Sequence, residues 1–322
     1  LETADGIKRV DLATDGLGQQ VLLKGYASEG HDSAHPDYGD IGTRIGGAED
    51  LNELLQIAHD YGTEIGIHIN ASEGYPEADA FSEDLMRIGS FGWNWVDESY
   101  SMNTMYDLTS GLRAQRLDSL REQLTDEDNL DFIYLDVWSA DTWQTNKISQ
   151  QFIERGWRCA NEWGYANEDD STWNHWAVDV DYGGSGSKGI NSDIMRFIRN
   201  HQKDSWQANY PAYGGTMVYP LLGGENSVSF EGWQRAKDFD TFVTVTFNDN
   251  VPTKFLQHYL VMEWENDETK SVEDGNTVKY IRLESEDGAD EVEVFRTESG
   301  GREIYYNGKM ILTGEVNMNG GW

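Results

Sequence analysis

The segment "FIYLDVW" (residues 132–138) is an apolar run that contains a single carboxylate, Asp136. Such a run, rich in β-forming residues and bounded by polar ones, predicts a strand buried on both faces in a parallel sheet. An unpaired charge is costly inside such a sheet, but the carboxyl ends of parallel strands are where α/β proteins bind their ligands. Asp136 is therefore a candidate site residue. Two alternatives stay open: it caps the following helix, or it pairs with a buried arginine.

Strand and helix patterns alternate on both sides of this segment. Besides 132–138, strands are predicted at 19–28, 63–72, 157–163 and 215–223, and helices at 47–62, 81–90, 110–124, 143–156 and 191–202, while 253–264 fits either. The alternation predicts an α/β fold, most simply a parallel (β/α)8-type barrel. Fewer than eight strands are recognisable before residue 265, so we expect the first strands of the barrel to precede residue 1.

The character of the sequence changes near residue 266. From there to residue 322 charged and β-forming residues alternate, with Asp-Gly, Gly-Gly and Asn-Gly pairs between them. These pairs are typical of the turns of antiparallel hairpins. We therefore predict a (β/α) barrel domain at 1–265 and an incomplete β-rich domain at 266–322.

The composition excludes several classes of partner. Lys and Arg number 24 against 58 Asp and Glu, a formal net charge of -34, so neither a nucleic-acid backbone nor an anionic membrane surface is an expected partner. Cys159 is the only cysteine, which rules out an intrachain disulfide. No segment has the length and apolar character of a membrane helix or a signal peptide. We expect any export signal to lie outside this chain.

The aromatic content favours a carbohydrate ligand. The chain has 12 Trp, 16 Tyr and 11 Phe, and many of the tryptophans stand among polar residues. Sugars present flat C–H faces ringed by hydroxyl groups, which suits aromatic platforms flanked by polar side chains. The alternative is that these tryptophans simply pack a large core. Trp93 and Trp95, two residues apart in "GWNWVD", would share one face of an extended segment and could form a stacking surface or lid.

Two carboxylates stand at predicted strand ends, Asp136 and, 26 residues later, Glu162 in "ANEWG". Neighbouring strands of a parallel sheet lie about 5 Å apart, so both groups would face one site. Glycosidases need such a pair, one as acid and the other as nucleophile or base. A structural carboxylate pair or a cation site is the alternative.

Residue parity adds further candidates. In "TEIGIHINAS" (63–72), His68 and Asn70 share the face opposite the isoleucines and would point into the barrel, unless His68 is a hydrogen-bonded core residue. The loop "EGHDSAHPDYGD" (29–40) holds two histidines four residues apart with acids between them. Pro36 and the preceding strand exclude the helix of an H-E-x-x-H metal site. A polar substrate-binding loop is the preferred interpretation, with Asp32 its best-placed residue.

Several stretches together resemble the catalytic barrel of glycoside hydrolase family 101, the endo-α-N-acetylgalactosaminidases. They are "LLKGYASEGHDSAHPDYGDIGTRIGGAEDLN" (22–52), "IHINASEGYPEADAFSEDL" (67–85), "FGWNWVD" (91–97), "FIYLDVW", "NEWG" (161–164), "DYGGSGSKGINSDIMRFIRNHQKDSW" (181–206) and "FEGWQ" (230–234). The resemblance implies a retaining enzyme that removes Galβ1-3GalNAc from serine or threonine of mucin-type glycoproteins, outside the cell or on its surface. An α-galactosidase-like hydrolase and a non-catalytic mucin-binding module are the alternatives.

The resemblance also assigns roles to residues. It implies Asp136 as nucleophile and Glu162 as acid/base, and it implies sugar-binding roles for Asp32, His35, His68, Asn70, Trp93, Trp95 and Gln234. It implies no cofactor for the chemistry and no metal among these residues. Structural calcium is compatible with the family, but its ligands cannot be located from this sequence.

Overall fold

The computed structural model describes residues 2–125, 130–163, 170–175, 239–247, 251–256, 258–265, 279–296 and 301–315. The chain divides into two compact units, Leu1–Asn174 and His175–Trp322, and each is described by itself.

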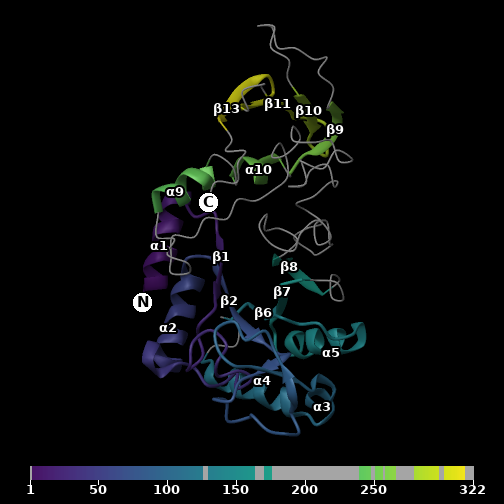
Figure 1. Cartoon of the computed structure of the whole chain (residues 1–322). Helices are drawn as coiled ribbons and strands as arrows, with labels where there is room; N and C mark the ends of the chain where they lie inside the picture. Colours follow the sequence, from purple (N-terminus) through teal and green to yellow (C-terminus); the bar gives the residue numbers. More distant parts are fainter. Residues whose placement is uncertain are drawn as a thin grey trace. The chain divides into compact units, whose positions relative to one another are not determined.

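The first unit is built on a five-stranded parallel sheet (Figure 1). Its strands, in spatial order, are β1 (Gln19–Leu23), β2 (Thr63–Asn70), β6 (Phe132–Asp136), β7 (Arg158–Asn161) and β8 (Ser171–Asn174). All four pairings are parallel, so the carboxyl ends of the strands meet at one edge. This arrangement confirms the predicted α/β class and the strand-helix alternation around Asp136.

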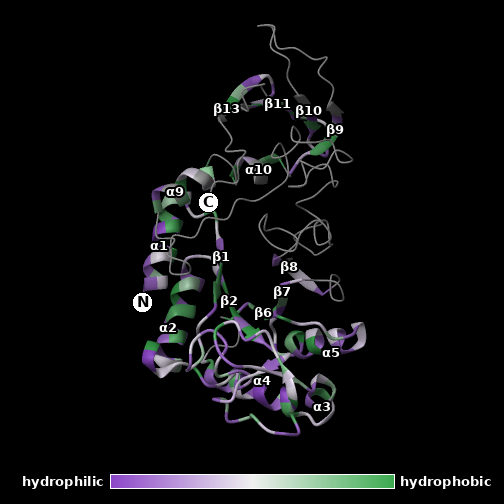
Figure 2. Cartoon of the chain, in the orientation of Figure 1, coloured by the Kyte–Doolittle hydropathy of each residue, from purple (hydrophilic) through white to green (hydrophobic). Residues whose placement is uncertain are grey.

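Helices precede the first strand or lie between later ones, and most of them pack in one core with the isoleucines of β2. They are α1 (Glu2–Thr14), α2 (Gly47–Asp60), α3 (Thr104–Thr109), α4 (Leu112–Gln123) and α5 (Thr142–Ile153), with a short 3-10 turn, η1, at Thr43–Ile45. In Figure 1, α1 and α2 lie side by side. Helix α2 shows why the sequence folds in this way, since its leucines recur at helical spacing and are buried. Figure 2 accordingly shows both hydrophobic and hydrophilic residues along α2.

The two faces of the sheet differ in what they contact. Ile65, Ile67 and Ile69 of β2 belong to the large core that also includes α2 and α5 residues. Phe132 and Tyr134 of β6 pack in a separate small cluster with Ala160 and Leu22. Because side chains alternate along a strand, His68, Asn70 and Asp136 lie on the same face as this small cluster. The parity prediction for His68 and Asn70 is therefore confirmed.

One predicted helix is wrong. The segment 81–90 forms a turn followed by strand β4 (Met86–Phe91), which pairs with β5 (Tyr100–Met102), which in turn pairs with β3 (Glu73–Gly74). Ser82 does cap a turn, because its Oγ accepts from the N–H of Leu85, but the turn is not continued. Gly89 then adopts a φ of 90°, which a helix does not accommodate. Pairing across the hairpin therefore outweighs the local helix propensity of this segment.

The second unit contains an antiparallel sheet of five strands. They are β9 (Leu260–Glu265), β10 (Lys279–Glu284), β11 (Glu291–Arg296), β12 (Gly301–Tyr306) and β13 (Lys309–Glu315), paired in sequence order, and helices α9 (Phe239–Val245) and α10 (Val251–Leu256) precede them. Residues Asn307 and Gly308, with φ of 48° and 74°, form the predicted turn between β12 and β13. The ambiguous segment 253–264 contains both the end of α10 and most of β9.

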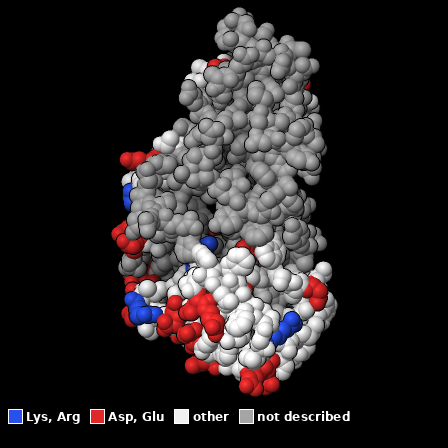
Figure 3. Space-filling model, viewed as in Figure 1, with Lys and Arg blue, Asp and Glu red and all other residues white. Residues whose placement is uncertain are grey.

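Some predictions fall outside what the structure describes. The helix at 191–202 and the strand at 215–223 lie outside the described residues. The domain boundary after residue 265 stays a prediction, although β9 pairs with β10 in the antiparallel sheet. None of the helices in the described part of the chain is long and apolar enough to cross a bilayer. Acidic side chains are more prominent than basic ones on the described surface seen in Figure 3, as the net charge predicts.

Candidate active site

Asp136 and Glu162 occupy matching places at the ends of adjacent strands. Leu135 of β6 is in register with Asn161 of β7, and each carboxylate directly follows its member of that pair. The backbone N–H of Glu162 donates to the carbonyl of Leu135 over 3.1 Å. Neighbouring strands lie about 5 Å apart, so the two carboxyl groups share one side of the sheet edge. Asp136 does not cap α5, because the N-cap is Asp141, whose carboxylate accepts from Gln144 N–H over 3.0 Å.

The surroundings drive the pKa values of these two carboxyl groups in opposite directions. Burial and, next, the negative charge of Asp136 raise the pKa of Glu162 to about 7, although the N–H of Val137 opposes the shift. Burial alone would also raise the pKa of Asp136, but the hydrogen bond and the charge of His68 outweigh it and lower that pKa. Near neutral pH this pair can hold one proton on Glu162 while Asp136 is ionised, which is the division between an acid and a nucleophile.

His68 lies between two carboxylates. Its Nε2 is 3.2 Å from Oδ2 of Asp136, and its Nδ1 is 3.4 Å from Oδ1 of Asp32. The imidazole is fully buried and stacks on Tyr134 with the ring centroids 5.7 Å apart. Burial lowers the pKa of His68, but the two acids outweigh burial, so the net effect is a raised pKa. A positively charged His68 stabilises Asp136 as an ionised group.

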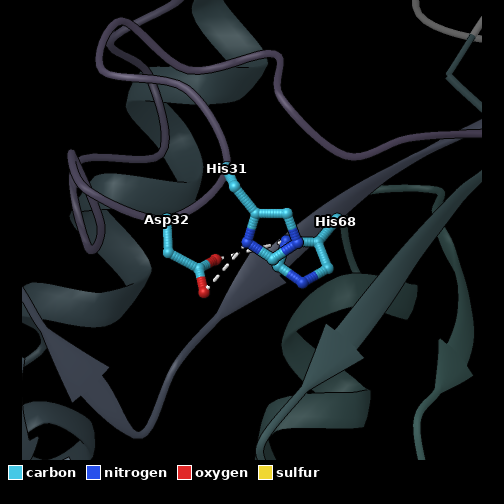
Figure 4. A group of neighbouring side chains, drawn as sticks. All are labelled: His31, Asp32 and His68. Atoms are coloured by element: carbon cyan, nitrogen blue, oxygen red, sulfur yellow. Dashed lines mark ion pairs between the residues drawn. The ribbon is translucent and has the colours of Figure 1, made fainter. Parts of the chain in front are cut away.

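Asp32 joins the loop after β1 to this site. Its Oδ1 is 3.3 Å from Nδ1 of His35, its Oδ2 is 3.2 Å from Nδ1 of His31, and Tyr75 donates its hydroxyl proton to Oδ2 over 3.2 Å. Burial would raise the pKa of Asp32, but the contacts with His31 and His35 hold it well below its ordinary value. Figure 4 shows His31 and Asp32 on the loop facing His68 on β2. The result is an ionised carboxylate surrounded by imidazoles.

His35 is a buried residue that supports the end of β2 beside Asp32. Its ring is fully buried, and its Nδ1 accepts the backbone N–H of Asn70 over 3.2 Å. Burial lowers the pKa of His35, which favours the neutral ring that this acceptor role requires. His35 thereby holds the end of β2 in place.

A second network of hydrogen bonds, centred on Glu73, holds the loop that contains Trp93 and Trp95. Glu73 Oε1 accepts the N–H of Trp93 over 2.6 Å, and its Oε2 accepts from Ser99 Oγ and Asn70 Nδ2 over 3.3 and 3.4 Å. Trp93 and Trp95 are 74% and 55% exposed, so they are not core residues. Asn94 between them has a φ of 52°, so the segment is not extended and the predicted shared face does not apply. Trp95 meets the ring of His31 edge-on at 5.6 Å.

The structure thus brings most of the predicted site residues together. Contacts link Asp32, His35, His68, Asn70, Asp136 and Trp95 directly or through one neighbour. Gln234 lies outside the described residues. The catalytic and sugar-binding roles themselves stay predictions.

Sequence reasoning missed four neighbours of the site, His31, Glu73, Tyr75 and Tyr134. Tyr134 could have been found, because it precedes Asp136 by two residues and pairs in register with His68. His31 stands beside Asp32 in a loop already selected as polar. Glu73 and Tyr75 gave no signal before the tertiary structure, since they follow β2 in a short hairpin strand and the chain after it.

A parallel α/β fold with acidic side chains at its strand ends is typical of the barrel glycosidases, and solved structures agree with this chain in fold. An α-N-acetylgalactosaminidase of Bifidobacterium bifidum, NagBb in its GalNAc complex, matches with a TM-score of 0.58 at 13% identity, over 94% of this chain and 52% of that one. An α-amylase of Geobacillus thermoleovorans matches with a TM-score of 0.57 at 10% identity, over 93% of this chain and 81% of that one. At these identities the likeness shows the fold alone.

Sequence comparison shows the particular family. Residues 1–243 match the family model described as "Endo-alpha-N-acetylgalactosaminidase", and residues 249–320 match the "Glycosyl hydrolase 101 beta sandwich domain". The chain belongs to glycoside hydrolase family 101. A protein of Renibacterium salmoninarum named "Putative endo-alpha-N-acetylgalactosaminidase" is 38% identical over 267 residues, which are 83% of this chain and 17% of that protein. The chain therefore spans a minor part of this relative's length.

Proposed function

We propose that this chain carries the active site of a retaining endo-α-N-acetylgalactosaminidase, which releases Galβ1-3GalNAc from serine or threonine of mucin-type glycoproteins. Family membership supports the glycosidase class and the O-linked substrate. The observation that carries the mechanism is the pair at the strand ends, with the pKa of Glu162 raised to about 7 beside an Asp136 whose pKa is lowered. Adjacent strands also suit the roughly 5–5.5 Å separation that retaining enzymes need.

The proposed reaction has two steps. A carboxylate oxygen of Asp136 attacks the anomeric carbon of the α-linked GalNAc, and the bond from that carbon to the Ser or Thr oxygen breaks as Glu162 delivers its proton to that oxygen. Glu162, now ionised, takes a proton from water, and the resulting oxygen attacks the same carbon and releases Asp136. Two inversions leave the configuration at the anomeric carbon unchanged.

We propose sugar-binding roles for the surrounding residues, Asp32, His35, His68, Asn70, Trp93, Trp95 and Gln234. Ionised Asp32 and the polar end of β2 are suited to accept and donate hydrogen bonds to sugar hydroxyls, and the exposed indoles are suited to stack on C–H faces. The proposed chemistry uses only protein side chains, so no cofactor is required. Because mucin-type glycoproteins lie outside cells, we propose that the protein acts outside the cell or on its surface.

The first test follows hydrolysis of a nitrophenyl α-glycoside of Galβ1-3GalNAc and identifies the product by mass spectrometry. We expect intact disaccharide, and no detectable turnover by Asp136→Ala. Asp141→Ala is the matched control, because it removes a nearby acid that caps α5 and costs about 1 kcal/mol of stability. Release of monosaccharide instead would favour an α-galactosidase-like enzyme. Binding without turnover would favour a glycan-binding module.

A second test separates the two carboxylates. In Glu162→Ala, kcat/KM for a natural glycopeptide should fall by about 10²–10⁴-fold, because the leaving Ser or Thr oxygen needs a proton. The loss should be much smaller for bond cleavage with a nitrophenolate leaving group, which departs without a proton. Azide should restore turnover in Glu162→Ala by replacing water in the second step, and the product should be the α-glycosyl azide. A β-glycosyl azide would exclude the retaining mechanism for this site.

A further inference from the structure

We propose that His31, Asp32 and His68 bind a divalent transition-metal ion of the Zn²⁺ class, and that the bound ion blocks the active site. One ligand atom from each of these residues lies within 4.8 Å of the other two. His31 and Asp32 come from the loop after β1 and His68 from β2, and Figure 4 shows the two imidazoles beside each other next to the carboxylate. The ring centroids of His31 and His68 are 4.4 Å apart.

The contact between His68 and Asp32 needs a positive charge to hold it together. A neutral imidazole has one N–H, and if Nε2 directs it at Asp136, then Nδ1 presents a lone pair. That lone pair faces Oδ1 of Asp32 at 3.4 Å, and neither of these buried atoms makes a hydrogen bond. Two lone pairs at this distance repel unless a cation lies between them. A second proton on His68 is one such cation, and a metal ion is another.

The spacing and the donor types select the class of metal. In a tetrahedral zinc site with bonds of about 2.0–2.1 Å, neighbouring ligand atoms lie about 3.3 Å apart. Nδ1 of His31 and Nδ1 of His68 are 3.2 and 3.4 Å from the two oxygens of Asp32. Two imidazoles and one carboxylate suit Zn²⁺, Co²⁺, Ni²⁺ or Cu²⁺, whereas Ca²⁺ and Mg²⁺ prefer ligand sets made of oxygen.

The expected effect of the ion is inhibition. The ion would bind Asp32, which we propose contacts the sugar. It would also take the place of the second proton on Nδ1 of His68, the nitrogen that faces away from Asp136. Ion and sugar then compete for the same side chains. Binding of the metal does not depend on the proposed function, and only the inhibition rests on it.

The test measures Co²⁺ binding by its visible absorption and Zn²⁺ binding by calorimetry, with the whole chain and with excess Ca²⁺ present to occupy surface carboxylates. We expect one Zn²⁺ per chain and the strong absorption bands of tetrahedral Co²⁺. His31→Ala and His31→Gln should each weaken Zn²⁺ binding by at least about tenfold. The exposed histidine of α2 gives the matched control, His59→Ala, and Cys159→Ser excludes the thiol; both should bind as the unchanged chain does.

Absence of the Co²⁺ bands, or Zn²⁺ binding unchanged in both His31 variants, would overturn the proposal. Circular dichroism checks that these variants remain folded. With the nitrophenyl disaccharide, Zn²⁺ should raise KM without lowering kcat, and His31→Gln should be less sensitive to it. If the chain binds Zn²⁺ but hydrolyses no substrate, the proposed function is wrong and the proposed metal site is supported. Hydrolysis insensitive to a saturating, bound Zn²⁺ would overturn the blocking role.

Discussion

The backbone N–H of Val137 donates a hydrogen bond of 3.0 Å to Oε2 of Glu162. Val137 directly follows Asp136, so this bond ties the ends of β6 and β7 together at the two candidate catalytic groups. Val137 has a φ of 49°, a left-handed conformation that is strained for a β-branched residue. Ser72 Oγ donates to the carbonyl of Val137, so both backbone polar groups of this residue are hydrogen-bonded. This fixed turn determines how the two carboxyl groups lie relative to each other.

The first prediction concerns pH. Glu162 must carry a proton to act as an acid, and its pKa is raised to about 7, so kcat/KM on a glycopeptide should fall as the pH rises through about 7. Asp136 must be ionised, and its lowered pKa keeps it so well into the acid range, so the acid side of the profile should begin below the ordinary pKa of an aspartate. Initial rates across the pH range test both limbs. If the residual activity of Glu162→Gln still falls at the same alkaline pH, the fall is caused by the titration of a group other than Glu162.

The second prediction concerns His68. His68→Phe keeps a ring on Tyr134 but removes the charge and the hydrogen bond that lower the pKa of Asp136. Of the remaining effects on Asp136, burial and the charge of Asp32 raise that pKa, and the charge of Lys24, the smallest effect, lowers it. The acid limb should therefore move to higher pH, and kcat/KM near neutrality should fall by about 10²-fold.

The pH profile separates this role from a purely structural one. A variant that only damaged the fold would lower the rate equally at every pH. The exposed His59→Phe is the control and should leave the profile unchanged. An unmoved acid limb in a folded His68→Phe protein would show that His68 does not set the ionisation of Asp136.

Four of the five strands of the parallel sheet and three of its site residues were predictable because their signals are local, whereas β8 was not predicted. Isoleucines alternating with Gly66, His68 and Asn70 identify both the strand and its two faces, and Asp136 stands out as a charge in an apolar run. Burial, parity and strand ends follow from such patterns.

The hairpin after β2 could not be predicted in the same way. Residues 82–85 do begin as a helical turn, and only the pairing of Met86 with Met102 and of Phe91 with Tyr100 makes β4 a strand. That pairing depends on residues distant in sequence. The same holds for Glu73, whose importance comes from its bond to Trp93, 20 residues away.

The third prediction concerns this glutamate. Glu73 is 5% exposed and accepts from Trp93, Ser99 and Asn70, so Glu73→Ala leaves buried donors without their acceptor. An unmade bond of this kind costs about 1–3 kcal/mol. The loop 92–99 should loosen, and KM should rise by about tenfold with little change in kcat, since the loop is proposed to bind sugar and not to react.

Hydrogen exchange tests the loop without any need for turnover. The amide of Trp93 should exchange faster in Glu73→Ala, and Glu73→Gln should restore most of the protection because its amide oxygen can still accept. Glu77→Ala removes an exposed acid four residues away and is the control. Equal exchange of Trp93 in the Ala and Gln variants would rule out the acceptor role.

The fourth prediction concerns the close approach of Gly66 and Phe132 inside the sheet. A Cβ added to Gly66 would lie 2.1 to 2.4 Å from three ring carbons of Phe132, which is itself 4% exposed and packed with Tyr134 and Ala160. The ring has to shift within a packed cluster, so Gly66→Ala should lower the free energy of unfolding by about 1–3 kcal/mol. In Gly25→Ala the new carbon meets its nearest atom at 3.8 Å, so this control should change stability little.

Chemical denaturation measures the free energy of unfolding of both alanine variants. Phe132→Leu combined with Gly66→Ala should show a favourable coupling between the two sites, because the smaller side chain makes room for the added methyl. Equal stability of the two alanine variants would mean that the ring moves aside without cost, and that the contact does not fix the face of β2 on which His68 and Asn70 lie.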